Sequence, residues 1–127
     1  MEISQKQINA VVALPGPDRY AHFIKKIVDR EEVWGLHLDG WALAGQGEDK
    51  NLFPVWPLKE YTLLCADHEW NGFVPKSLSL EEFVDELLPK LKRDEVGVAV
   101  FYTPFDLGVV PSFDQLREDI ENEIKKY

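Results

Sequence analysis

Three short serine motifs constrain this chain more than any other feature, because each predicts where a helix begins. They are Ser4-Gln5-Lys6-Gln7, Ser79-Leu80-Glu81-Glu82 and Ser112-Phe113-Asp114-Gln115. In each motif the serine hydroxyl can accept from the amide of the fourth residue, whose Gln or Glu side chain can reach back to the serine amide. Each motif opens a run of apolar residues at helical spacing, so we expect helices over 5–14, from Leu80 onward and from Phe113 to about Tyr127.

Prolines indicate where other helices begin or break. Pro15 ends the first helix, and a second begins near Pro17 with one apolar stripe at helical spacing, formed by Tyr20, Phe23, Ile24, Ile27 and Val28. A proline suits the first turn of a helix, so Pro57 is expected to open a helix over about 58–66. Pro89 lies inside the helix that follows Ser79. It lacks an amide donor there and predicts a kink or an early end.

The segment VWGLHLDGWALAG predicts a β-hairpin, because Asp39-Gly40 between two strand-like runs is a strong hairpin signal. A two-residue loop would pair Leu38 with Trp41. One face would then form core through its large side chains, which are Trp34, Leu36, Leu38, Trp41 and Leu43. The other face would admit a helix backbone or line a shallow cavity, and it would hold Gly35, His37, Ala42 and Ala44.

Two further segments have the character of strands. NLFPVW at 51–56 is expected to lie at a sheet edge or to carry a bulge, because Pro54 cannot donate to a ladder. VGVAVFY at 96–102 is apolar on both faces, as in a central strand, whereas 67–78 is expected to be a polar and aromatic connection. We therefore expect one α+β domain over 1–127, with a mainly antiparallel sheet of four to five strands and helices packed chiefly on one face.

The chain carries a formal net charge of −9, and this charge is unevenly distributed. Residues 1–30 carry +2, so the remaining 97 residues carry −11. Such a surface repels phosphate groups, which argues against binding to nucleic acid or to an anionic membrane. It would suit a basic protein partner, and acidic surfaces also serve solubility alone.

Cysteine usage and hydropathy favour a cytoplasmic protein with no cofactor. Cys65 is the single cysteine, so an internal disulfide is impossible, and a reducing compartment suits this usage. The first residues lack a signal-peptide pattern, and no apolar run approaches the ~20 residues of a membrane span. Asp67-His68-Glu69 is a weak candidate for a metal site, because adjacent side chains point in different directions.

Catalytic motifs are equally weak. The sequence contains no nucleophile elbow, phosphate-binding loop or dinucleotide-binding fingerprint. His68 follows Cys65 at helical spacing, and a histidine can activate a cysteine, but a buried inert cysteine is the commoner arrangement. The sequence names no catalytic residue and favours a protein that is not an enzyme.

The four tryptophans all lie between residues 34 and 70. Two of them belong to the predicted hairpin, whereas Trp56 and Trp70 have no such assignment. Together with Tyr61 they are candidate anchors for a partner, since Trp and Tyr side chains dominate many interfaces. The alternative is that Trp70 folds back over Trp56 and closes a small cluster beneath the 67–78 connection.

The order of these motifs resembles a known family. RYAHFIKKIVDREEVWGLHLDGWAL, then FPVWPLKEYTLLC, then a tryptophan and PKSLSLEEFVDELLPKL resembles the bacterial family known as domain of unknown function 2750, over about residues 19–102. The resemblance implies a small, soluble protein of the bacterial cytosol. It supplies no catalytic residues.

Three functions are compatible with these observations. The leading hypothesis is a non-enzymatic binding or adaptor module that uses its aromatic residues as anchors and its acids to attract a basic protein. The second is a small-molecule-binding protein or enzyme with a shallow aromatic pocket to which His37 and His68 supply polar groups. The third is self-association through an apolar seam on the last helix, formed by Leu116, Ile120 and Ile124.

Overall fold

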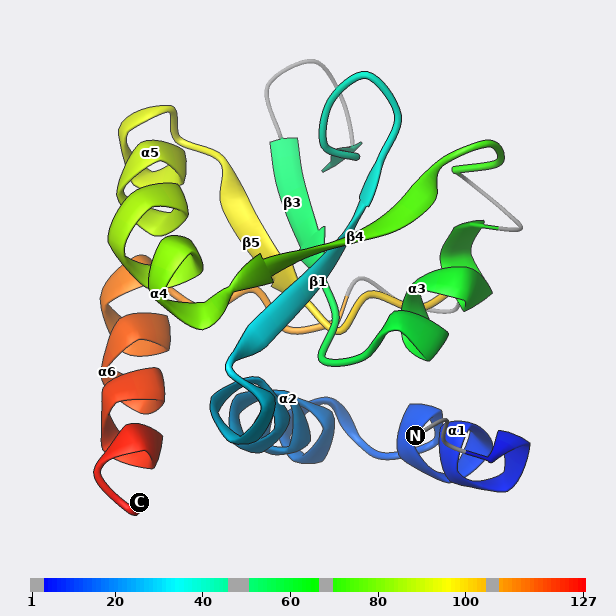
Figure 1. Cartoon of the computed structure of the whole chain (residues 1–127), viewed down its shortest axis with the longest axis horizontal. Coiled ribbons are helices and arrows are strands. Elements are labelled where there is room, and N and C mark those ends of the chain that lie inside the picture. Colours follow the sequence, from blue (N-terminus) through cyan, green and yellow to red (C-terminus); the bar gives the residue numbers. More distant parts are fainter. Residues whose placement is uncertain (1–3, 46–50, 67–69, 105–107) are drawn as a thin grey trace.

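The computed structural model describes residues 4–45, 51–66, 70–104 and 108–127 (Figure 1). Within these ranges the elements, in chain order, are α1 (Gln5–Val12), α2 (Gly16–Arg30), β1 (Glu32–His37), β2 (Ala44–Gly45), β3 (Asn51–Val55), α3 (Lys59–Ala66), β4 (Val74–Ser79), α4 (Leu80–Glu82), η1 (Phe83–Leu87), α5 (Leu88–Arg93), β5 (Gly97–Val100) and α6 (Phe113–Ile124).

The serine motifs start helices as predicted. The Gln7 amide donates to the Ser4 hydroxyl at 3.2 Å, and the Ser4 amide donates to the Gln7 side-chain oxygen at 3.1 Å, which completes the reciprocal cap. Ser79 and Ser112 also accept from the amide three residues later, each at 3.1 Å. The apolar stripe of α2 is buried as expected at Phe23, Ile24, Ile27 and Val28.

The helix after Ser79 is interrupted where Pro89 predicts a kink. The α-helical turn α4 is followed by the π-helical segment η1 and then by α5, and we call Leu80–Arg93 the broken helix. The Leu88 amide donates to the Phe83 carbonyl, which is the i to i−5 bond of a π turn. Pro89 follows in the first turn of α5, where the amide that a proline lacks is least needed.

The predicted hairpin is wrong in its pairing. β1 pairs antiparallel with β4, with Val33 opposite Leu78 and His37 opposite Val74. The sequence assigned β4 to a connection because its Pro, Lys and Ser residues are typical of loops. Only a single bridge, His37 to Trp41, remains of the predicted hairpin, and the chain then leaves to join β3 through β2.

The predicted large-residue face is correct at Leu36, which is buried, and Trp34 and Trp41 pack against the core, but the prediction is wrong at Leu38 and Leu43. The His37–Trp41 bridge leaves a loop of three residues, 38–40, with Asp39 in the left-handed region. A shift of one residue in register sends each following side chain to the opposite face. Leu43 is therefore 48% exposed, whereas Ala42 and Ala44 are buried, and Leu38 is 50% exposed because it lies in the loop itself.

β3 pairs parallel with β5, with Phe53 opposite Val98. The two-residue β2 adds antiparallel to the other side of β3 and pairs only with Asn51 and Leu52. β3 is therefore the central strand of its sheet, and the predicted edge position of Pro54 is wrong. Its missing donor is tolerated because β2 pairing ends at Leu52, and the next partner on that side is Trp34, which bridges Trp56.

The chain is a single α+β domain, but its sheet differs from the prediction. In place of one mainly antiparallel sheet, two small sheets meet at the Trp34–Trp56 bridge, and one of them contains the parallel β3–β5 pair. The helices are not chiefly on one face. In Figure 1 the broken helix and α6 lie to the left of the strands, α1 and α2 lie below them, and α3 lies to the right.

Candidate functional site

The three aromatic side chains predicted as partner anchors are part of the core. Trp56 has no exposed surface, Tyr61 is 2% exposed and Trp70 is 6% exposed. The Trp56 and Trp70 rings meet edge to face with centroids 6.2 Å apart. Trp70 therefore covers Trp56, as in the alternative reading of the sequence, and none of the three can contact a partner from this position.

Polar contacts keep this aromatic cluster in place. The Trp56 indole N–H donates to the Tyr102 carbonyl at 2.7 Å, and the Cys65 thiol donates to the same oxygen at 3.6 Å. Burial, followed by the charge of Glu60, raises the pKa of Tyr61 to about 12, so its hydroxyl stays protonated at neutral pH. These groups stabilise the fold, and Cys65 is a buried thiol of the inert kind.

His37 lies at the end of β1 in a small, partly exposed aromatic group. Its ring meets the edge of Trp41 at a centroid distance of 5.3 Å, and the Lys76 ammonium lies 5.4 Å from the Trp41 centroid. The predicted partner of His37, His68, lies outside the described residues, as does the rest of the Asp67-His68-Glu69 cluster. In the described part of the chain, no three His, Cys, Asp or Glu side chains form a group that could hold a metal ion.

The apolar seam of α6 points mainly inward. Leu116 and Ile120 are buried, whereas Ile124 is 45% exposed. The seam docks the last helix inside the protomer, so Leu116 and Ile120 do not provide the self-association surface that the sequence allowed. Ile124 instead lies at the edge of a groove.

That groove runs between the broken helix and α6 and has a volume of about 580 Å³. Its floor is apolar and is made by Leu80, Val84, Ile120 and Ile124. Its rim carries four exposed acids, which are Glu31, Glu81, Asp85 and Glu121. We call these residues, together with Ser79 and Arg117, the acidic groove; its single base leaves it with a formal charge of −3.

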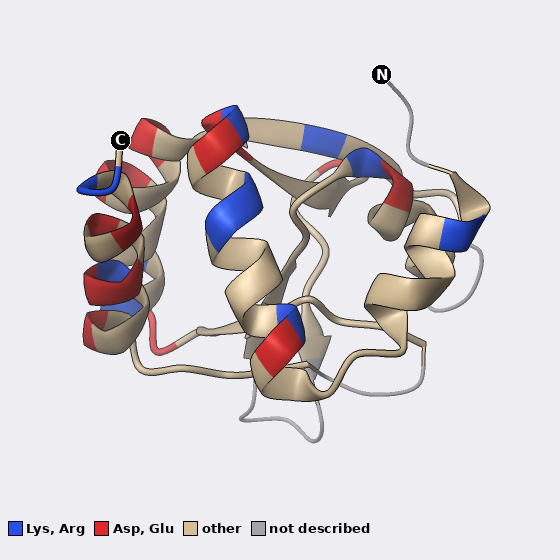
Figure 2. Ribbon diagram, turned by 90° about the horizontal axis from the view of Figure 1, so that it is seen from below, with Lys and Arg blue, Asp and Glu red and all other residues tan. Residues whose placement is uncertain are grey.

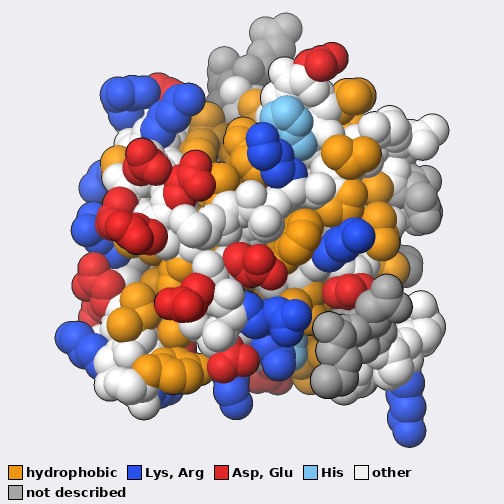
Figure 3. Space-filling view, in the orientation of Figure 1, with side chains coloured by type: hydrophobic (Ala, Val, Ile, Leu, Met, Phe, Trp, Pro, Cys, Tyr) orange, Lys and Arg blue, Asp and Glu red, His pale blue; other side chains and the backbone are white. Residues whose placement is uncertain are grey.

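Each wall of the acidic groove has a local structural origin. The Ser79 cap starts the broken helix, and the π turn of η1 sets the positions of Val84 and Asp85. Glu31 ends α2 in the left-handed conformation and lies far from the other residues in sequence. Figure 2 shows acidic residues repeated along α6, and Figure 3 shows acids around exposed apolar atoms on the side where Figure 1 places the broken helix and α6.

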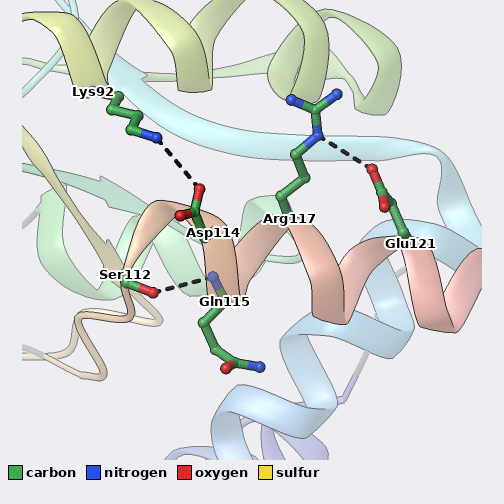
Figure 4. Close-up of polar contacts among 6 residues, drawn as sticks. All are labelled: Lys92, Ser112, Asp114, Gln115, Arg117 and Glu121. Atoms are coloured by element: carbon green, nitrogen blue, oxygen red, sulfur yellow. Dashed lines mark hydrogen bonds and ion pairs between the residues drawn. The ribbon is translucent and has the colours of Figure 1, made fainter.

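A second hollow adjoins the groove at the other end of α6. We call it the basic cleft; it has a volume of about 390 Å³ and is lined by Leu88, Pro89, Lys92, Arg93, Phe113, Asp114 and Arg117. In Figure 4 Lys92 reaches from α5 to Asp114 on α6, at 3.3 Å, and Arg117 pairs with Glu121 one turn later, at 3.2 Å. Arg117 lines both hollows.

Sequence reasoning missed both hollows. The acids of the groove come from three segments that meet only in the folded chain, and a chain with 23 Asp and Glu residues contains many acid pairs without meaning. The available signal was Glu81 and Asp85, four residues apart beside Val84, at the spacing that places side chains on one helix face.

Comparison with known proteins identifies the chain by family. In the described part, no helix is both long and apolar enough to cross a membrane. A search of curated proteins found no match. The model of the family described as Protein of unknown function (DUF2750) matches residues 20–120, which extends the resemblance noted in the sequence from 102 into α6. It includes every residue of the acidic groove except Glu121 and Ile124. The chain therefore belongs to the DUF2750 family.

Proposed function

We propose that this protein is a non-enzymatic binding module whose acidic groove holds a basic, amphipathic helical segment of a partner protein. The observation that carries the proposal is the combination of an apolar floor with a rim of four carboxylates. Helix-in-groove recognition uses an apolar stripe at i, i+3 or i+4, and i+7 against such a floor. A basic flank on that stripe would then meet the rim.

Apolar burial and charge have different roles in this binding. Ile124 and Val84 keep part of their apolar surface in water, and covering that surface contributes to affinity. The rim acids are exposed, so they contribute mainly to the rate of encounter and to partner choice. The net charge of −9 extends this attraction over the surface, and added salt weakens it because exposed charges are screened.

The direct test uses a defined ligand. A 15-residue peptide with leucines at i, i+4, i+7 and i+11, and lysines on either side of the leucine stripe, is titrated into labelled protein and followed by NMR. The expected result is that amide shifts concentrate in 79–85 and 117–124. Shifts confined to other parts of the surface, or no saturable binding, contradict the proposal.

A matched pair of variants tests the role of the rim. Asp85→Lys changes a rim acid, and Glu118→Lys changes an exposed acid of α6 that does not line the groove. Each moves the formal net charge from −9 to −7, so a general charge effect is the same in both. We expect Asp85→Lys to weaken peptide binding about tenfold, which corresponds to about 1.4 kcal/mol, and Glu118→Lys to change it far less.

The apolar floor is tested with residues of equal exposure. Ile124 is 45% exposed beside the groove, and Leu63 is 44% exposed on α3. Ile124→Ser should weaken binding of the peptide, whereas Leu63→Ser should not. Equal losses in the two variants mean that the peptide binds exposed apolar residues without a defined site.

A further inference from the structure

We infer that the acidic groove and the basic cleft form one surface of opposed charge along α6, which selects the direction in which a partner helix binds. This inference rests on the proposed function and names the ligand further: a helix with acids near its N-terminus and bases near its C-terminus. The observation that supports this inference is that the two hollows share Arg117 and lie end to end.

The order of lining residues shows how the two walls run. The basic cleft is lined by Leu88–Arg93 of the broken helix and by 113–117 of α6, whereas the acidic groove is lined by 80–85 and by 117–124. Later residues of one wall thus face earlier residues of the other. The walls run antiparallel. The broken-helix wall changes from acids, Glu81 and Asp85, to bases, Lys92 and Arg93, whereas the α6 wall carries Asp114, Arg117 and Glu121 in alternating sign.

The two ends differ clearly in charge. Leaving aside Arg117, which both hollows share, the groove end has four acids, a formal charge of −4, and the cleft end has two bases against Asp114, a formal charge of +1. The cleft bases already pair with acids of the chain: Lys92 with Asp114 at 3.3 Å and Arg93 with Asp94 at 3.4 Å. These pairs are solvent-exposed, and exposed ion pairs contribute little, so a ligand carboxylate can take over either base.

The direction of the ligand follows from its own helix dipole. A helix is stabilised by acids near its N-terminus and by bases near its C-terminus. Placing acids over the cleft and bases over the groove sets the ligand parallel to α6, with its N-terminus near Phe113 and its C-terminus near Ile124. The 12 residues of α6 extend over roughly 18 Å, so a ligand that reaches both ends needs about three helical turns.

Arg117 lies at the junction of the two hollows. Its guanidinium pairs with Glu121 one turn later on α6, and in Figure 4 it extends away from α6 toward the facing helical segment. A ligand base that approaches Glu121 must compete with Arg117, whereas a ligand acid at this level gains from it. Because Arg117 lines both hollows, it does not distinguish the two directions, and the discrimination rests on Lys92 and Arg93 of the cleft against the acids of the groove.

The test compares two peptides of identical composition and identical leucine stripe. One has glutamates in its first turn and lysines in its last turn, and the other has these blocks exchanged. Both are stapled so that their helicity in circular dichroism matches, because the first would otherwise form helix more readily. We expect the first to bind wild-type protein at least about tenfold more tightly by calorimetry.

Two double variants test which residues make the protein prefer the first peptide over the second. Lys92→Glu with Arg93→Glu should remove most of the ratio between the two peptides, because it reverses the charge of the cleft. The control Lys25→Glu with Lys59→Glu changes two exposed bases of α2 and α3 by the same amount and should preserve the ratio. Thermal unfolding of each variant checks that it is folded before binding is compared.

Each result has one meaning. Tighter binding of the first peptide, lost only in the cleft variant, supports the inference. Equal binding of both peptides, tighter binding of the exchanged one, or an equal effect of the two double variants overturns the direction and leaves the groove as a binding site. Binding of neither peptide overturns the proposed function and this inference with it.

Discussion

The Trp56 indole N–H donates to the Tyr102 carbonyl at 2.7 Å, in a position with no solvent access. This bond ties the end of β3 to the segment after β5, while the Trp70 ring packs against both residues. Trp56, which the sequence suggested as an anchor for a partner, therefore stabilises the fold by joining these two segments. This also moves the search for a function to the surface formed by the broken helix and α6.

Replacing Trp56 tests that structural role. Trp56→Phe removes the buried donor and part of the ring, and should lower the free energy of unfolding by about 2–3 kcal/mol in chemical denaturation. Trp34→Phe is the matched control, because the Trp34 N–H donates to the Glu32 carboxylate at 3.1 Å in a half-buried position. That loss should stay below about 1 kcal/mol. Similar losses of stability in both variants would contradict this structural role of Trp56.

Gly108 is required by the close approach of two backbone segments. A Cβ built there would lie 2.1 Å from the Val100 carbonyl oxygen, and its φ is +77°. Gly72 has a φ of +94°, but its nearest neighbour, Leu38, is 3.9 Å away. Both Ala variants carry conformational strain of about 1 kcal/mol. Gly108→Ala adds a backbone clash and should lose at least about 2 kcal/mol more, measured by thermal unfolding.

The same pair of glycines can contradict this explanation. Losses of equal size in Gly108→Ala and Gly72→Ala would mean that only the positive φ matters, and that the Val100–Val109 bridge tolerates a side chain.

His22 should make stability depend on pH. Burial, followed by the charges of Lys26 and Lys25, lowers the pKa of His22 below its ordinary value of 6.5. Between that lowered pKa and 6.5 the unfolded chain binds a proton that the folded chain does not, so stability rises with pH in this window. His22 therefore makes the fold less stable as pH falls from 6.5 through the lowered pKa.

Urea titrations between pH 7.5 and 5 measure this effect. His22→Gln should flatten the loss of stability on the acidic side of 6.5, and Lys26→Gln should reduce it by raising the pKa of His22. An NMR titration of the His22 ring in wild type that gives a pKa at or above 6.5 would contradict the prediction.

Tyr20 holds α2 against α6. Its hydroxyl donates to Asp119 at 2.5 Å, and burial, followed by this bond, raises the pKa of Tyr20. Tyr20→Phe should cost about 1 kcal/mol, because it removes a partly buried bond to a charged group. Tyr127→Phe is the control: its hydroxyl donates to Asp29 at 3.4 Å in an exposed position, and its loss should be within about 0.5 kcal/mol. A larger effect at Tyr127 than at Tyr20 contradicts this ranking.

The helices could be predicted well because their signals are local. A serine cap and the spacing of apolar residues act within about two turns, so Ser4, Ser79 and Ser112 marked real starts, and Pro89 marked a real irregularity. The wrong predictions concerned pairing between distant strands. The loop after His37 has three residues in place of the two predicted, which left Leu43 exposed, and β4 has the composition of a connection although it pairs with β1.

For the candidate site too, local features could be predicted from the sequence, whereas contacts between distant segments could not. The sequence alone determined the helices, the apolar stripes that bury them and the acidic character of the chain, because these depend on residue type and short spacing. Only the tertiary structure decided that Trp70 covers Trp56, and that Glu31, Asp85 and Glu121 form the rim of one groove. The physical reason is that such contacts join segments far apart in the chain. Their geometry depends on strand register and helix packing together, which no single stretch of residues specifies.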